Sequence, residues 1–301
     1  MPISRKHKQF TRFFPNTQYK HISYIRTRHK AYSAMKHYFI ALFLSLSSLG
    51  CASLGKSVNF FSLEDDIILG KQADAQLKAD TRYKFLKPTD KNYDAITRYV
   101  NRIKDKLLQA NDIPHEQQFN YTVQVIDDDV INAFATAGGY VYLYTGIMKF
   151  LDNEAQLAGV LAHELAHVAH RHGSNQMAVK GITHAILAET LKGKNEAIQA
   201  LAGIGYQLAM LSYSREDENE ADESGALWMS RTDYNPYESQ AFFKKIREMK
   251  NASNPPEFLS THPNPENRIA NIERVLRSLN AKNEGNTYER DYREFKKLLS
   301  R

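Results

Sequence analysis

Three residues with metal-binding and acid–base side chains, His163, Glu164 and His167, form the pattern HExxH. On a helix, positions four apart lie about 40° from each other around the axis and one turn along it, so both imidazoles can reach one metal ion. Glu164 is turned about 100° from His163 and can face water at that ion. Zinc lowers the pKa of such water toward about 7, and a neighbouring carboxylate accepts its proton. The pattern predicts metal-assisted hydrolysis with Glu164 as the general base.

The competing interpretation is a pair of hydrogen-bonded core histidines beside a surface glutamate. The residues around the pattern are mostly apolar over Leu157–Ala166. An imidazole buried among them without a partner would cost free energy. We therefore favour the metal site, with one zinc ion per chain.

A catalytic zinc needs a third protein ligand and an open fourth position. The arrangement HExxHxxGxxH is excluded, because His170 stands at its glycine position and Gly173 at its last histidine position. The acidic segment Ser214–Asp222 offers Glu218 and Asp222, four apart on an expected helix. Glu218 could complete the site, and Asp222 could accept the free N–H of a ligand histidine and fix its tautomer. Four other carboxylates compete for the ligand role: Glu216, Asp217, Glu220 and Glu223.

The elements that hold these side chains follow from the spacing of apolar residues. Helical spacing predicts helices over Leu63–Asp80 and Asn92–Ala110. Alternation predicts a half-buried strand over Asn120–Ile126, and in Asn132–Gly146 two adjacent glycines separate two short extended runs. From about Asn153 onward the chain is predicted to be helical. The fold class is therefore α+β, mainly helical with a small β part.

The charge of the chain is concentrated at its start. The 301 residues carry a formal net charge of +6, yet residues 1–50 hold nine Lys and Arg and no Asp or Glu. The remaining chain has 31 basic and 34 acidic residues, so it lacks the basic surface that a polyanion requires, and no nucleic-acid partner is expected. The single cysteine excludes a disulfide framework and a multi-cysteine metal cluster.

The sequence from Met35, MKHYFIALFLSLSSLGC, is typical of a short secretory signal that ends at a lipid-modifiable cysteine, Cys51. The cleavage site resembles that of bacterial lipoproteins, and this resemblance implies that Ala52, which follows the cysteine, favours sorting to the outer membrane of a Gram-negative cell. The alternative is that Cys51 is a small buried residue and the signal is cleaved elsewhere or retained. The predicted organisation is an upstream extension or mis-assigned start at 1–34, a signal peptide at 35–50, a tether at 51–62, a catalytic domain at 63–280 and a C-terminal helical tail at 281–301, which we expect to be a surface helix.

Three segments together resemble one known family: HELAH followed by HRH, then SREDENEAD, then STHPNPENRI at Ser260–Ile269. The family is that of zinc metallopeptidases, of the gluzincin type, that includes CAAX prenyl endopeptidases, the HtpX heat-shock protease and periplasmic proteases that tend outer-membrane proteins. The resemblance covers about Leu63–Leu279 and implies a zincin-type domain with a small sheet bordering the cleft. It implies these roles: zinc ligands His163, His167 and Glu218, general base Glu164, supporting carboxylate Asp222, and His262, which either polarises the substrate or occupies the metal.

The segment Asn132–Gly146 resembles the family's strand at the border of the cleft, to which a substrate peptide could add as another strand. Ala137 stands where the family commonly has a proline before the paired glycines. His170 and His172 are predicted to be surface residues of a helix. Arg268 is expected either to pair with a carboxylate near the site or to cap its own helix.

The leading functional hypothesis is a periplasmic zinc endopeptidase, lipid-anchored to the outer membrane, that cuts unfolded or misassembled envelope proteins. The alternative is a zinc-stabilised chaperone or assembly-factor lipoprotein with little or no proteolysis. A membrane-embedded prenyl-protein protease is disfavoured, because charged residues interrupt the nearest apolar stretch, Ile182–Leu211.

Overall fold

The computed structural model describes residues 59, 61–110, 113–178, 212–249, 256–263 and 265–299. These residues belong to one structural unit, Val58–Arg301. The predicted upstream extension, signal peptide and lipidation site Cys51 lie outside the described residues, as does the whole apolar stretch Ile182–Leu211. Among the described helices, none combines the length and the apolar character that a bilayer crossing requires.

The sheet has three strands in the order β1-β3-β2. Strand β1 (Thr122–Ile126) runs parallel to β3 (Tyr140–Tyr144), and β2 (Ala133–Ala135) pairs antiparallel with β3. The short helix η1 (Ala137–Gly139) joins β2 to β3, and Gly138 has a φ of 73°, in the left-handed region that favours glycine. The small β part with two runs separated by glycines is confirmed.

Two long helices precede the sheet, close to the predicted bounds. Helix α2 (Leu63–Ala79) begins at a capping box in which Ser62 and Asp65 satisfy each other's backbone N–H groups. Helix α3 (Tyr93–Gln109) buries one apolar stripe against the rest of the core, formed by Ile96, Val100, Ile103 and Leu107.

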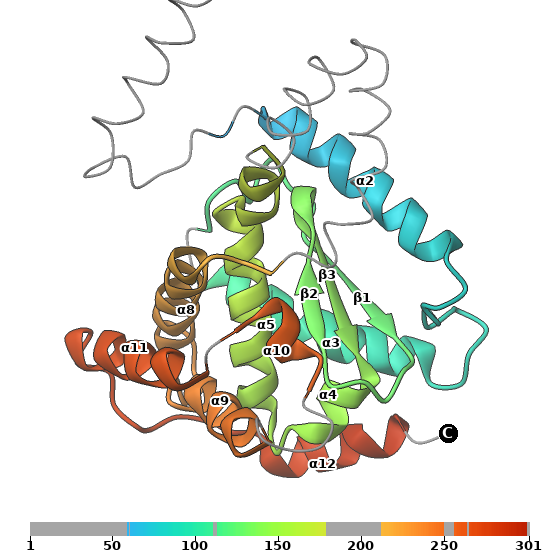
Figure 1. Ribbon diagram of the computed structural model, residues 1–301. Coiled ribbons are helices and arrows are strands. Elements are labelled where there is room, and N and C mark those ends of the chain that lie inside the picture. The colour runs from blue at the N-terminus through green and yellow to red at the C-terminus, as the bar shows by residue number, and fades with distance from the viewer. Residues whose placement is uncertain are drawn as a thin grey trace, which may run out of the picture. The chain divides into compact units, whose positions relative to one another are not determined.

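Helix α5 (Glu154–Ala169) is buried along its whole length. It lies between the β2 side of the sheet and helix α8 (Arg215–Ser230), and α9 (Glu238–Met249) packs against it as well (Figure 1). Gly225 allows the close approach of α8, since a Cβ at that position would lie 3.3 Å from the backbone nitrogen of His163. Helix α11 (Pro265–Ser278) covers α8 and α9, and the short helix α10 (Phe258–Thr261) precedes it. The predicted α+β class, mainly helical, is confirmed.

The first residue of α5, Glu154, lies in a cluster of polar side chains that satisfies both of its carboxylate oxygens. Glu154 is fully buried, and both of its carboxylate oxygens accept hydrogen bonds. Tyr99 and Tyr234 donate through their hydroxyl groups at 2.5 Å and 2.6 Å. Arg102 donates to both oxygens, at 3.0 Å and 2.6 Å. This cluster ties the start of α5 to α3 and to the loop after α8.

The C-terminal helix α12 (Glu289–Leu298) lies at the surface, and most of its residues are exposed, as expected. The sequence did not predict that Tyr292 and Phe295 are buried in the main hydrophobic core. The Phe295 ring stacks on Tyr99 with centroids 3.8 Å apart, and the Tyr292 hydroxyl donates to the Met148 carbonyl at 2.6 Å. Apolar residues spaced three and four apart form a narrow buried seam even where most neighbours are charged.

Candidate metal centre

Four buried side chains converge where α5, α8 and the chain after α10 meet. His163 and His167 project from α5 with their Nε2 atoms 2.9 Å apart. Glu218 comes from α8, with one oxygen 3.6 Å from Nε2 of His163 and the other 3.5 Å from Nε2 of His167. His262 follows α10, with its Nδ1 3.0 Å from Glu218 and 3.3 Å from Nε2 of His163. One ligand atom from each of the four lies within 4.8 Å of the others.

These side chains fit a divalent metal ion. Tetrahedral zinc with nitrogen and oxygen ligands at about 2.0–2.1 Å separates its ligand atoms by about 3.3 Å, close to the separations observed here. Burial lowers the pKa of His167 to about 3 and the pKa of His163 well below its ordinary value. Burial opposes ionisation of Glu218, but Arg268 and His262 hold its pKa well below the ordinary value. Neutral imidazoles beside an ionised carboxylate are the protonation states that metal binding requires.

Glu164 lies beside this group and is fully buried. Neither of its carboxylate oxygens has a hydrogen-bond partner among the described residues, and one of them lies 3.4 Å from Nε2 of His262. Burial raises the pKa of Glu164 to about 7. A buried carboxylate without a partner is costly, and one with a pKa near neutrality is suited to take up and return a proton.

An ion pair between Asp222 and Arg268 contacts His163. The Asp222 carboxylate lies 3.1 Å from its Nδ1. Arg268 binds that carboxylate at 2.6 Å and reaches Glu218 at 2.8 Å, and it is 2% exposed. Of the two expectations for Arg268, pairing near the site is the correct one. The position of Asp222 matches the supporting role implied by the family resemblance.

His167 has a different partner, which sequence reasoning missed. Its Nδ1 lies 2.9 Å from Nδ1 of His172, whose Nε2 lies 3.3 Å from Glu220. His172 is buried, so its assignment to a helix surface is wrong. The reason is that α5 ends at Ala169 and Arg171 adopts a φ of 59°, which turns the chain back. The signal available in the sequence was the HRH run that begins three residues after His167.

Of the acidic residues that competed for the ligand role, the structure brings Glu218 into the group. Asp217 forms the capping box at the start of α8 with Ser214. Glu220 approaches His172, and Glu223 pairs with Arg274. His262, expected from a separate element, does reach the group.

The comparisons with known proteins identify the family. Residues 94–276 match peptidase family M48 over more than half of the chain. The chain belongs to this family. The predicted metallopeptidase family is thereby confirmed, and with it the expectation of a metal.

Individual relatives agree with the family assignment. The chain is 33% identical over 193 residues to the beta-barrel assembly-enhancing protease of Escherichia coli (strain K12), which covers 60% of this chain and 38% of that protein. It is 27% identical over 263 residues to the human "Metalloendopeptidase OMA1, mitochondrial", which covers 78% of this chain and 49% of that protein. The chain thus matches about two fifths to one half of the length of these relatives.

Proposed function

We propose that this chain is a zinc-dependent endopeptidase with His163, His167 and Glu218 as zinc ligands and Glu164 as general base. The observation that carries the proposal is the placement of Glu164. It is buried without a hydrogen-bond partner among the described residues, directly beside a group of three imidazoles and one carboxylate. A purely structural metal site has no use for a free carboxylate at that position.

Zinc bound there would supply a Lewis acid that polarises the scissile carbonyl and acidifies water. Glu164 accepts the proton of the attacking water and returns it to the leaving amine. Asp222 holds the proton on Nδ1 of His163, so that the Nε2 lone pair faces the ligand group. Arg268 compensates the charges of Asp222 and Glu218, both of which are buried.

His262 has two roles open to it. Its ring lies among the ligand atoms, which supports a fourth ligand that keeps the enzyme inactive. A histidine that leaves the group could instead donate a hydrogen bond to the oxyanion of the transition state. His262→Ala distinguishes the two: activity rises if the ring blocks the site and falls if it stabilises the transition state.

The Glu164→Gln variant tests the proposed chemistry. We expect it to keep one zinc ion per chain and to lose cleavage of an unfolded protein substrate, because an amide cannot accept the proton. Equal cleavage by the variant and the wild type would end the proposal. Metal content measured on the same samples separates loss of the base from loss of the metal.

For the biological setting we propose a periplasmic protease of a Gram-negative cell, anchored to the outer membrane through lipid on Cys51. Its substrates would be unfolded or misassembled outer-membrane proteins. The name of the Escherichia coli relative supports this setting. The hypothesis predicts that Cys51→Ser abolishes incorporation of labelled palmitate and releases the chain from membranes. Lipid labelling that persists in Cys51→Ser would contradict the anchor.

A second candidate is a zinc-stabilised chaperone or assembly factor. The position of His262 favours it, because a ring among the ligand atoms caps the site. Complementation of an envelope defect by Glu164→Gln would support the chaperone, since a scaffold does not need the base.

A further inference from the structure

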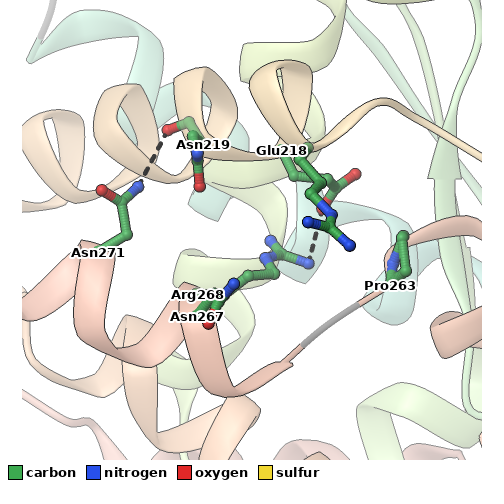
Figure 2. A pocket seen from close by; sticks show the side chains of 7 residues that line it. Glu218, Asn219, Pro263, Asn267, Arg268 and Asn271 are labelled. Carbon is green, nitrogen blue, oxygen red and sulfur yellow. Dashed lines mark hydrogen bonds and ion pairs between the residues drawn. The ribbon is translucent and has the colours of Figure 1, made fainter.

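A pocket lined mainly by residues with polar side chains lies between the N-terminal parts of α8 and α11, next to Glu218. Its volume is about 250 Å³, and Pro263, the residue after His262, closes one side. Figure 2 shows Glu218 and Arg268 reaching toward one another from the two helices at this pocket. The same Glu218 carboxylate belongs to the metal-binding group, so the pocket and the metal centre share a wall.

The lining of the pocket is rich in hydrogen-bond donors. Arg215, the first residue of α8, is exposed and lines the pocket. Its guanidinium has no hydrogen bond or ion pair with the described residues of the chain, unlike that of Arg268. Asn219 and Asn267 add exposed side-chain amides from the two facing helices. Among the described residues, the pocket therefore offers one positive charge without a carboxylate partner, with neutral donors around it.

The acidic residue in the lining does not cancel this charge. Glu218 is bound by Arg268 at 2.8 Å and by His262 at 3.0 Å, and it is 3% exposed. Its negative charge is directed toward these partners and toward the metal group. A carboxylate entering the pocket would instead meet the free guanidinium of Arg215, which binds carboxylates through paired N–H groups.

The volume limits what can enter. Pockets for drug-sized ligands and cofactors measure about 300–1,000 Å³, so about 250 Å³ suits a single side chain or a chain terminus. We propose that this pocket is a substrate subsite that recognises a carboxylate close to the scissile bond, with Arg215 as its main determinant. The inference rests on the proposed peptidase function. It adds a preference in the cleaved sequence that the zinc chemistry itself does not require.

The carboxylate can come from an acidic side chain or from the C-terminus of a peptide, and three small probes separate these sources. N-acetylglutamate α-amide carries only the side-chain carboxylate, and N-acetylalanine carries only the terminal one. N-acetylglutamine α-amide is the neutral control. Each is titrated into the full chain while NMR follows the backbone amides of residues 214–219.

We expect saturable shifts with at least one carboxylate probe and none with the neutral amide. Arg215→Gln should weaken binding about tenfold or more, because a hydrogen bond to a charged group is lost. Arg215→Lys should restore part of the affinity, because it keeps the charge. Arg277→Gln is the matched control: it removes an exposed arginine near the other end of α11 and should leave the titration unchanged. No saturable shift with either carboxylate, or equal affinity in Arg215→Gln, overturns the subsite.

Cleavage products provide the second readout. Mass spectrometry of an unfolded protein digested by the wild type should show Asp or Glu enriched at one fixed position from the cut bond, or cuts at a fixed distance from the C-terminus. Arg215→Gln should lose that preference while cutting continues at other sites. The same site profile in both proteins overturns the inference. Absence of cleavage by the wild type contradicts the proposed peptidase function instead, and the titration then decides the subsite by itself.

Discussion

Helix α5 carries two fully buried glutamates, ten residues apart, in opposite circumstances. Glu154 accepts hydrogen bonds on both oxygens from Tyr99, Arg102 and Tyr234. Glu164 has no hydrogen-bond partner among the described residues. A satisfied buried carboxylate stabilises the fold, whereas an unsatisfied one costs free energy and persists for another reason. The difference supports a structural role for Glu154 and the proposed catalytic role for Glu164.

The largest expected effect belongs to Glu164→Gln. Loss of a general base lowers kcat by about 10²–10⁴-fold. The free energy of unfolding should stay the same or rise, because a buried carboxylate without a hydrogen-bond partner among the described residues is replaced by a neutral group of the same shape. Steady-state kinetics and thermal unfolding on one preparation check both. A strongly destabilised variant would show that Glu164 has a structural role and would remove the contrast with Glu154.

Glu154→Gln should give the reverse pattern. The amide cannot accept every hydrogen bond that the carboxylate accepts, so we expect a loss of about 2–3 kcal/mol in the free energy of unfolding. The cleavage rate per folded molecule should stay close to that of the wild type. Urea unfolding and kinetics corrected for the folded fraction measure the two quantities. A catalytic loss as large as that of Glu164→Gln would contradict the assignment.

The two histidines proposed as zinc ligands, His163 and His167, form a second contrast on the same helix. Asp222 contacts Nδ1 of His163 and is itself paired with Arg268. His167 instead contacts His172, which in turn contacts Glu220. Loss of such an outer partner typically lowers metal affinity about 10–100-fold.

His172→Phe should therefore weaken zinc binding about tenfold, which competition with a chelator measures. His170→Asn is the comparison, because His170 bonds to Ser224 at 2.7 Å and lies beside His172 and Glu220, so we expect it to weaken zinc binding less than His172→Phe does. Equal zinc affinities of His172→Phe and the wild type would show that His172 does not support zinc binding.

The smallest effect is expected for Tyr234→Phe. It removes one of the hydrogen bonds to Glu154 and keeps the buried ring. We expect a loss of about 1 kcal/mol in the free energy of unfolding and no change in kcat. Thermal unfolding of Tyr234→Phe and Glu154→Gln, measured side by side, would show whether each hydrogen bond to Glu154 contributes separately to the free energy of unfolding or whether the bonds act only together.

The sequence predicted what short-range spacing determines. HExxH and the four-residue step from Glu218 to Asp222 fix relative directions on single helices, and the structure brings these side chains together. The fold class and the early helices follow from apolar periodicity in the same way.

What the sequence did not predict depends on changes of chain direction and on long-range packing. On a continuous helix His172 would lie about 140° from His167, and only the turn at Arg171 brings it back. The burial of the narrow apolar stripe of α12 depends on a contact between residues far apart in the sequence, the stacking of Phe295 on Tyr99, and could not be predicted from local spacing.

The most direct test of the proposed zinc site is the zinc content and zinc affinity of the purified chain and its Glu218→Ala variant. If His163, His167 and Glu218 bind zinc, the wild-type chain holds one zinc ion, and Glu164→Gln and Glu154→Gln retain it. In Glu218→Ala the affinity should fall by more than the roughly 100-fold that loss of an outer partner causes. A folded wild-type chain that binds no zinc, or a Glu218→Ala variant that binds zinc as tightly as the wild type, would contradict the central claim.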